Sequence, residues 1–337
     1  MPFTLSHAAA VLPLIRTDGT GRGRLVPAVL IAGTFAPDMT YYAASVLSGA
    51  MEYGDVTHSF PGVLTVDVAV AWALVGLWLV VREPLVALLP PDRQHRVAAL
   101  LRCGAPRARV RVRTVWWWYT SAVLGALSHV VWDAFTHLDR WGMRVFPVLG
   151  EEIAGSPLYW YLQYGGSAVA AVVIAVFVGR GLQRMRGIWG IRGIREVSGT
   201  GERAISGAGR RGISGTEEER GGGWGRGRAG SGGFAGVPAR VPVLSGRERV
   251  LAVLVIAGIT VLAAVERAVS WWGRWSAVAE PWELIPTVCF GGGAGLLVGV
   301  VGYAVTVRVR RYARYARGGG ETGGEGEGAA WERVGRR

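Results

Sequence analysis

Several apolar runs of about the length of a bilayer crossing constrain this sequence more than any other feature. A helix needs roughly 20 consecutive, mostly apolar residues to span the hydrocarbon core. Hydrophobic residues make up 50% of the chain. Full spans are predicted at 60–81, 115–135, 161–179, 250–265 and 284–307. We therefore expect an all-α, polytopic helical membrane protein with about five full spans.

The first forty residues are apolar in two segments that are each too short for a full span. Residues 3–15 and 25–36 are separated by a polar, glycine-containing stretch at 16–24. They predict either a re-entrant pair of short helices or one helix with an interfacial segment. The first segment has no basic residues before its apolar run, so we interpret it as part of the mature chain and not as a signal peptide.

The basic residues of the chain indicate its orientation. There are 37 of them, all arginine, and they concentrate in residues 82–113, in residues 180–247 and after residue 307. By the positive-inside rule these segments face the cytoplasm, as in a multi-pass protein of the bacterial cytoplasmic (inner) membrane. Orientation and attraction to anionic lipid explain this charge, so we expect membrane lipid as a partner and no nucleic acid.

The pattern divides the chain into four parts. Residues 1–180 are predicted to form a membrane-embedded core, and residues 181–247 a disordered, Arg/Gly-rich cytoplasmic linker of low complexity. Residues 248–310 are predicted to form a two-helix transmembrane hairpin, followed by a disordered tail at 311–337. Glycines at 291, 295 and 299 recur every four residues, which predicts a face where another helix packs closely.

The segment SHVVWDAFTH contains the main functional motif. It places His129, Asp133 and His137 four residues apart, so on a helix they share one face. Ionisable groups at membrane depth are costly and usually face a bundle interior, a partner or a wet cavity. Taken alone, the motif fits either a metal-binding face or a polar helix end that emerges into water.

Three further residues are expected on the same side of the membrane. His58 begins a predicted span in THSFPG, Asp38 lies in APD, and His7 joins them if the N-terminus forms a hairpin. Histidine and carboxylate without cysteine are typical of catalytic zinc, manganese or iron sites. We expect zinc, with manganese or iron as alternatives. The predicted metal-ligating residues are His7, Asp38, His58, His129, Asp133 and His137, and the catalytic candidates among them are Asp133, His129 and Asp38.

Asp67 is a further carboxylate inside a predicted span. An intramembrane carboxylate is a functional hypothesis by default. It could orient a ligand imidazole, pair with an arginine of another helix, or be neutral and hydrogen-bonded within the bundle.

Five motifs together resemble a known family: MPFTLSHAAAVLPL, APD, THSFPGVLTVD, LSHVVWDAFTH and LYWYLQYGGS. They resemble a bacterial polytopic membrane-protein family catalogued as a domain of unknown function. That family is similar to inner-membrane metal-dependent hydrolases, and its order of ligands is distantly similar to zinc-dependent phospholipase C. The resemblance implies that His7, Asp38, His58, His129 and Asp133 are ligands. No histidine follows His137, so one or two ions are expected and not three.

These features lead to one main functional hypothesis and two alternatives. The main one is a membrane-embedded metal-dependent hydrolase that cleaves a phosphoester of a lipid or envelope intermediate through a metal-bound water. The first alternative is a metal-ion or proton transporter that uses the same His/Asp cluster, with Asp67 along its path. The second is a non-catalytic membrane scaffold that holds a structural metal.

Overall fold

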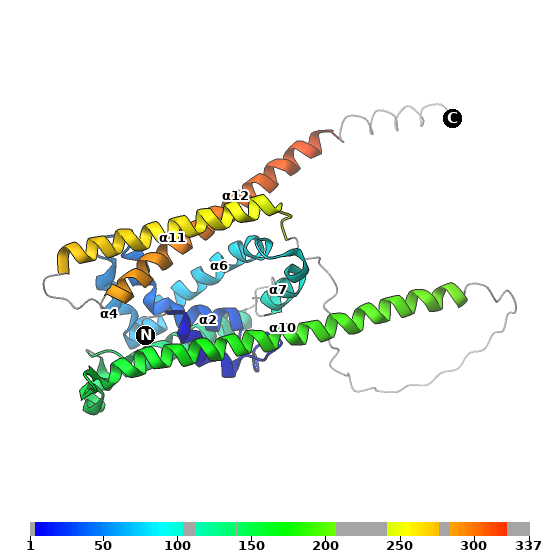
Figure 1. Ribbon diagram of the computed structural model, residues 1–337. Coiled ribbons are helices and arrows are strands. Elements are labelled where there is room, and N and C mark those ends of the chain that lie inside the picture. Colours follow the sequence, from blue (N-terminus) through cyan, green and yellow to red (C-terminus); the bar gives the residue numbers. More distant parts are fainter. Residues whose placement is uncertain (1–3, 104–111, 139, 207–240, 276–283, 322–337) are drawn as a thin grey trace, which may run out of the picture.

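Helices form almost the whole of the structure, a computed structural model that describes residues 4–103, 112–138, 140–206, 241–275 and 284–321 (Figure 1). The N-terminal half contains η1 (Thr4–His7), α1 (Ala8–Val11), η2 (Leu12–Leu14), α2 (Pro27–Phe35), η3 (Ala36–Asp38), α3 (Met39–Ala43), η4 (Ala50–Tyr53), α4 (Gly54–Thr57), α5 (Phe60–Leu64), α6 (Val66–Ala87) and α7 (Pro91–Cys103). The remainder contains α8 (Val112–Ala134), α9 (Trp141–Val145), η5 (Pro147–Gly150), β1 (Glu152–Ile153), β2 (Ser156–Pro157), α10 (Leu158–Ser206), α11 (Gly246–Trp275) and α12 (Leu284–Glu321). The two strands pair antiparallel, with Ile153 opposite Ser156.

Four of these helices are long and apolar enough to cross a membrane: Val66–Ala87, Leu158–Arg184, Gly246–Arg274 and Leu284–Ala313. The helix α8 covers the remaining predicted span and has 23 residues, which corresponds to about 34 Å at the usual helical rise. The predicted all-α polytopic membrane fold is confirmed.

The predicted span at 60–81 differs from the observed helices at its beginning. The chain breaks at Thr65, whose φ of −128° and ψ of −81° are not helical, so α5 and α6 are separate helices. The hydroxyl of Ser59 caps α5 by accepting a hydrogen bond from the Gly62 amide. As a result, Asp67 lies in the first turn of α6 and not deep within a continuous helix.

The N-terminus forms two short helical segments, as one of the two sequence alternatives predicts. A turn that contains a β-bridge between Ile15 and Gly21 joins them. Val11 and Leu12 of the first segment pack against Leu30 of α2, and all three are buried. This apolar contact holds the N-terminus against the bundle, which places His7 in the protein interior.

The core of the bundle lies where α2, α6 and α8 meet, with Val29, Ala32, Val68, Ala71 and Ala122 among its buried residues. Figure 1 shows the α11–α12 hairpin on one side of α6, while the long α10 runs past α2 on the other side. The short segments between α2 and α5 gather at one end of these helices, and they bring Asp38 and His58 to that end.

Two helices extend beyond the predicted boundaries of the membrane core and hairpin. The helix α10 continues to Ser206, so the first part of the predicted linker is helical. The helix α12 likewise continues to Glu321. Stretches such as LQRM and YARYAR contain good helix formers that extend a span already nucleated. The rest of the predicted linker (207–240) and of the tail (322–337) lies outside the described residues.

The glycine face of α12 packs against α11, as its four-residue spacing predicts. A Cβ atom placed on Gly295 would lie 2.7 Å from the Ile259 carbonyl oxygen, and one on Gly299 would lie 3.2 Å from the Ile256 Cα. Only glycine permits this approach of the two backbones.

Gly295→Leu is therefore expected to destabilise the hairpin by roughly 1–3 kcal/mol, the usual cost of overpacking. The matched control is Gly302→Leu on the same helix, because a Cβ at Gly302 meets no atom within 4 Å. Thermal unfolding in detergent, followed by tryptophan fluorescence, should show a lower Tm for the first variant only. Equal Tm values for the two variants would contradict this packing role.

Candidate metal centre

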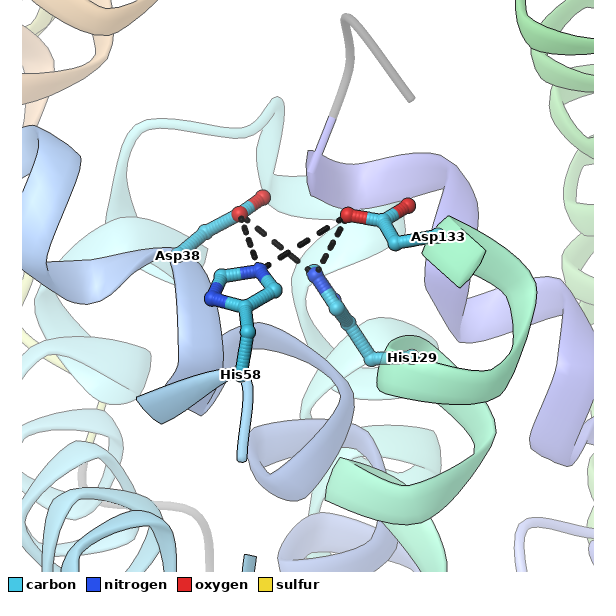
Figure 2. Close-up of side chains that lie close together, drawn as sticks. All are labelled: Asp38, His58, His129 and Asp133. Atoms are coloured by element: carbon cyan, nitrogen blue, oxygen red, sulfur yellow. Dashed lines mark ion pairs between the residues drawn. The ribbon is translucent and has the colours of Figure 1, made fainter. Parts of the chain in front are cut away.

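Four buried side chains converge at one end of the bundle: Asp38, His58, His129 and Asp133 (Figure 2). Asp38 ends η3, and His58 follows the last residue of α4. His129 and Asp133 lie one turn apart near the end of α8. Figure 2 shows both imidazole rings directed towards the two carboxylates, which come from opposite sides. Three separate segments therefore build one cluster.

The Nε2 atoms of both histidines face the same pair of carboxylates. His129 Nε2 lies 3.2 Å from Asp133 Oδ2 and 3.4 Å from Asp38 Oδ1. His58 Nε2 lies 3.7 Å from Asp133 Oδ2 and 3.7 Å from Asp38 Oδ1. All four candidate ligand atoms fall within 4.8 Å of one another.

These distances suit a tetrahedral ion. Zinc binds imidazole nitrogen and carboxylate oxygen at about 2.0–2.2 Å, so neighbouring ligand atoms of a tetrahedral site lie roughly 3.3–3.5 Å apart. The observed nitrogen-to-oxygen distances of 3.2 to 3.7 Å bracket that value. His129 Nε2 is also buried and makes no hydrogen bond within the described part of the chain. The donor set and its spacing thus fit a divalent cation.

Backbone carbonyls fix the orientation of both rings. Nδ1 of His129 lies 2.8 Å from the Thr34 carbonyl oxygen, and Nδ1 of His58 lies 2.9 Å from the Gly54 carbonyl oxygen. A carbonyl can only accept, so each Nδ1 carries a proton, and Nε2 is the nitrogen that faces the carboxylates and could bind a metal. Metal-ligating histidines generally have such a partner on the second nitrogen.

Asp38 is held by a hydroxyl from the N-terminal segment. Thr4 donates to Oδ2 of Asp38 at 2.5 Å, which leaves Oδ1 facing the histidines. Burial alone would raise the pKa of this carboxyl, but the neighbouring His129 outweighs burial and lowers the pKa to about 2. Asp38 is therefore an ionised carboxylate, the form that binds a cation.

His7 lies beside the four-residue cluster. Its ring stacks on His129 with centroids 3.7 Å apart and planes 15° apart. Its Nε2 lies 3.5 Å from Asp133 Oδ1, the carboxylate oxygen that does not face His58 or His129. This nitrogen is buried and makes no hydrogen bond within the described residues. His7 can thus orient Asp133, or it can share that carboxylate as a ligand of a second ion.

His137 lies at the margin of the cluster, and its side chain is 36% exposed. Its Nδ1 is 3.7 Å from Asp133 Oδ2 and 3.3 Å from the Asp133 carbonyl oxygen, while its Nε2 is 3.3 Å from Gln163 Nε2. The structure therefore brings four of the six predicted residues into one group, places His7 against it and leaves His137 on its outer side.

A cavity of about 230 Å³ opens onto the cluster. Asp38, His58 and Asp133 form part of its wall together with His137, Gln163, Tyr41, Arg140, Met51, Pro286 and Phe290. Burial raises the pKa of Tyr41 to about 12, so its phenol stays protonated and can donate a hydrogen bond. Three of the four clustered residues thus border a cavity large enough for a small molecule.

Within the described residues, Asp67 does not orient a ligand imidazole, pair with an arginine or form a hydrogen bond in the bundle. Its side chain is fully buried, and neither carboxylate oxygen makes a hydrogen bond within the described part of the chain. It contributes no atom to the four-residue group.

Several contributors to the site carry no sequence signal. The Thr34 and Gly54 contacts use backbone carbonyls, and Thr4, Tyr41 and Gln163 have side chains that are common in other contexts. Arg140 follows the His/Asp motif in a loop that is poor in arginine. Only the three-dimensional arrangement identifies these residues.

Comparison with known proteins gives a family but no activity. No curated protein and no solved structure matches the chain, and the similarity to metal-dependent hydrolases therefore stays a prediction. One family model, described as Domain of unknown function (DUF4184), matches residues 1–305. The predicted resemblance to a family of unknown function is thereby confirmed, and the chain belongs to the DUF4184 family.

Proposed function

We propose that the protein is a membrane-embedded, metal-dependent hydrolase that cleaves a phosphoester of a lipid or envelope intermediate. One observation carries this proposal. The Nε2 atoms of His58 and His129 face the same two carboxylates, while backbone carbonyls hold both Nδ1 atoms. Such an arrangement is pre-organised for a cation, and it opens onto a cavity.

A divalent cation at this site, with zinc favoured over manganese or iron, would polarise a phosphoryl oxygen and activate a water molecule. His58, His129 and Asp133 would hold it, Asp38 would complete the set, and His7 would orient Asp133 or share its second oxygen with another ion. Other side chains form the wall of the cavity around this ion. The phenol of Tyr41 offers a proton donor at the wall, and the apolar side chains of Met51 and Phe290 limit access of water.

Arg140 supports an anionic substrate. Arg140 lines the cavity, and its Nη1 lies 3.9 Å from Oδ1 of Asp55, so a cationic side chain borders the space next to the cluster. Arginine binds phosphate oxygens in a bidentate manner. The substrate would thus place its phosphoryl group between Arg140 and the cluster.

Arg140→Gln is expected to raise the KM for a phosphoester by roughly 10-fold or more, because a hydrogen bond to a charged group contributes about 1.5–3 kcal/mol. The matched control is Arg144→Gln, since Arg144 is exposed and lies outside the cavity wall. Steady-state kinetics of the purified variants would measure the difference. Equal KM values for the two variants would show that Arg140 does not bind the substrate.

The position of the cluster supports access from the outer face of the bacterial cytoplasmic membrane. His129 and Asp133 lie at the opposite end of α8 from Arg113, and α6 runs from the cluster towards the Arg-containing α7. By the positive-inside rule the arginines would be cytoplasmic. The cluster would then face outwards.

The two alternatives differ in what the site should do. Transport through Asp67 would require a polar route, but within the described residues Asp67 makes no hydrogen bond. A structural metal is favoured by the four candidate ligands, which can fill a tetrahedral site. The cavity against three of these residues favours a catalytic site instead.

The test uses the full chain purified in detergent, with a chromogenic phosphodiester, a phosphomonoester and a phospholipid as substrates. We expect hydrolysis that stops on chelation and returns with zinc or manganese. His58→Asn should lose this hydrolysis, because asparagine can still donate to the Gly54 carbonyl but has no atom at the Nε2 position. Retained metal without hydrolysis of any ester would favour the structural alternative. Hydrolysis that survives both chelation and the substitution would contradict the proposal.

A further inference from the structure

A second, partly open cavity of about 480 Å³ lies between helices of the bundle, apart from the metal centre. One face of α2 forms a wall through Ala28, Ile31 and Phe35, and α6 forms another through Leu77 and Trp78. The helix α10 forms a third wall with Phe177 and Val178. None of its lining residues lines the cavity at the metal centre. Its occupant therefore need not be the substrate of the proposed hydrolase.

The walls of this cavity suit a hydrocarbon chain. The indole nitrogen of Trp78 is the single polar side-chain group among the lining residues, whereas a buried water needs about two to four polar partners. The volume is within the roughly 300–1,000 Å³ of small-molecule sites. An empty apolar cavity of this size would also forfeit dispersion contacts along its walls. Both α6 and α10 are candidate membrane spans, so lipid is the surrounding solvent.

One end of the cavity lies among exposed arginines. Ile15, Gly19 and Gly181 line this end, and a Cβ on Gly181 would lie 3.2 Å from the Thr17 carbonyl oxygen, so α10 and the N-terminal turn meet there. Arg16 precedes that turn, while Arg180 and Arg184 flank Gly181, and all three side chains are exposed. The nearby carboxylate of Asp18 accepts hydrogen bonds from Thr20. The cation excess favours an anionic headgroup.

We propose that this cavity binds one acyl chain of an anionic membrane phospholipid, whose phosphate headgroup is held by the arginines next to Gly181 and in the N-terminal turn. The apolar walls recognise the chain, and the arginines near Gly181 recognise the headgroup. The lipid would fill the space between α2, α6 and α10 and hold these helices at their observed spacing.

The first experiment fills the cavity. Full-length protein is exposed to mixed micelles with equal amounts of phosphatidylglycerol and phosphatidylcholine, and native mass spectrometry then counts the lipids retained after delipidating washes. Wild type should retain one phosphatidylglycerol. Ala28→Phe should reduce this retention at least tenfold, and the same change at the exposed Ala73 of α6 should leave it unchanged.

A second cavity variant keeps the test valid if the first variant misfolds. Val178 lines the cavity and is 43% exposed, so Val178→Trp can be accommodated without displacing the core. It should also lose the lipid. The proposal would be overturned if the wild type retained no lipid. It would also be overturned if both cavity variants retained as much lipid as the Ala73→Phe control.

The second experiment tests the headgroup. Arg180→Gln combined with Arg184→Gln should abolish the preference for phosphatidylglycerol over phosphatidylcholine while one lipid is still retained. Arg310→Gln, at an exposed position of α12, should keep the preference. An unchanged preference in the double variant would overturn the assignment of the headgroup to this end of the cavity.

Discussion

Replacing His129 and Asp133 together with alanine should abolish retention of a divalent ion by the purified protein. These residues supply two of the four candidate ligand atoms, and His129 Nε2 lies closest to both carboxylates. The loss of metal affinity should exceed the roughly 10–100-fold change that follows removal of an outer hydrogen-bond partner of a ligand. Elemental analysis of detergent-purified protein, expressed as ions per chain, measures the effect.

Two controls separate loss of the ion from loss of the fold. Replacing the exposed Asp92 of α7 with alanine removes a carboxylate that is not among the four clustered residues, and the metal content should not change. His129→Asn removes Nε2 but keeps a side-chain donor for the Thr34 carbonyl. It should fold, as judged by circular dichroism and size-exclusion chromatography, without the ion. A folded His129→Asn protein with wild-type metal content would exclude His129 as a ligand.

The sequence was sufficient to predict the membrane class because apolar runs of about 20 residues are typical of helices that cross a bilayer. At Thr65, however, the prediction of a continuous span is wrong. The residues around it are apolar and predict a continuous span, whereas the cap of Ser59 on α5 and the backbone of Thr65 divide the span in two. Hydropathy measures only transfer to lipid, so it does not detect a local break in helical backbone.

The residue types of the cluster could also be predicted from the sequence, but the backbone contacts that orient its side chains could not. The spacing of His129 and Asp133 follows from helical geometry, and the topology brings His58 and Asp38 to the same end. The proton positions depend instead on the carbonyls of Thr34 and Gly54, which any residue could provide. No pattern of residue types encodes such contacts.

The approach of α2 to α8 connects the fold to the site. Gly33 of α2 and Gly125 of α8 face each other, and a Cβ on Gly125 would lie 2.3 Å from the Leu30 carbonyl oxygen and 2.9 Å from the Gly33 Cα. Thr34 is the next residue along α2, and its carbonyl oxygen lies 2.8 Å from His129 Nδ1. His129 is one turn beyond Gly125 on α8. The contact between these glycines thus sets the distance at which Thr34 orients the imidazole.

Gly125→Ala should therefore weaken both the fold and the metal centre. The new methyl group meets backbone atoms that cannot rotate away, so the helices must separate, at a cost of roughly 1–3 kcal/mol in the free energy of unfolding. Separation would draw the Thr34 carbonyl away from His129, which loosens the ring and lowers metal affinity. Thermal unfolding and competition with a metal chelator measure the two effects.

Gly76→Ala is the matched control, because Gly76 lies within α6 and a Cβ there would meet no atom within 4 Å. It should leave metal affinity unchanged and could stabilise the helix by up to about 1 kcal/mol through better helix propensity. Gly33→Ala should behave like Gly125→Ala, since its Cβ would lie 2.5 Å from the Ala122 carbonyl oxygen. If Gly125→Ala instead matched Gly76→Ala in both Tm and metal affinity, the glycine contact would not position His129. The ring would then owe its orientation to the cluster itself, and the Thr34 carbonyl would only accept a hydrogen bond from an imidazole that is already in place.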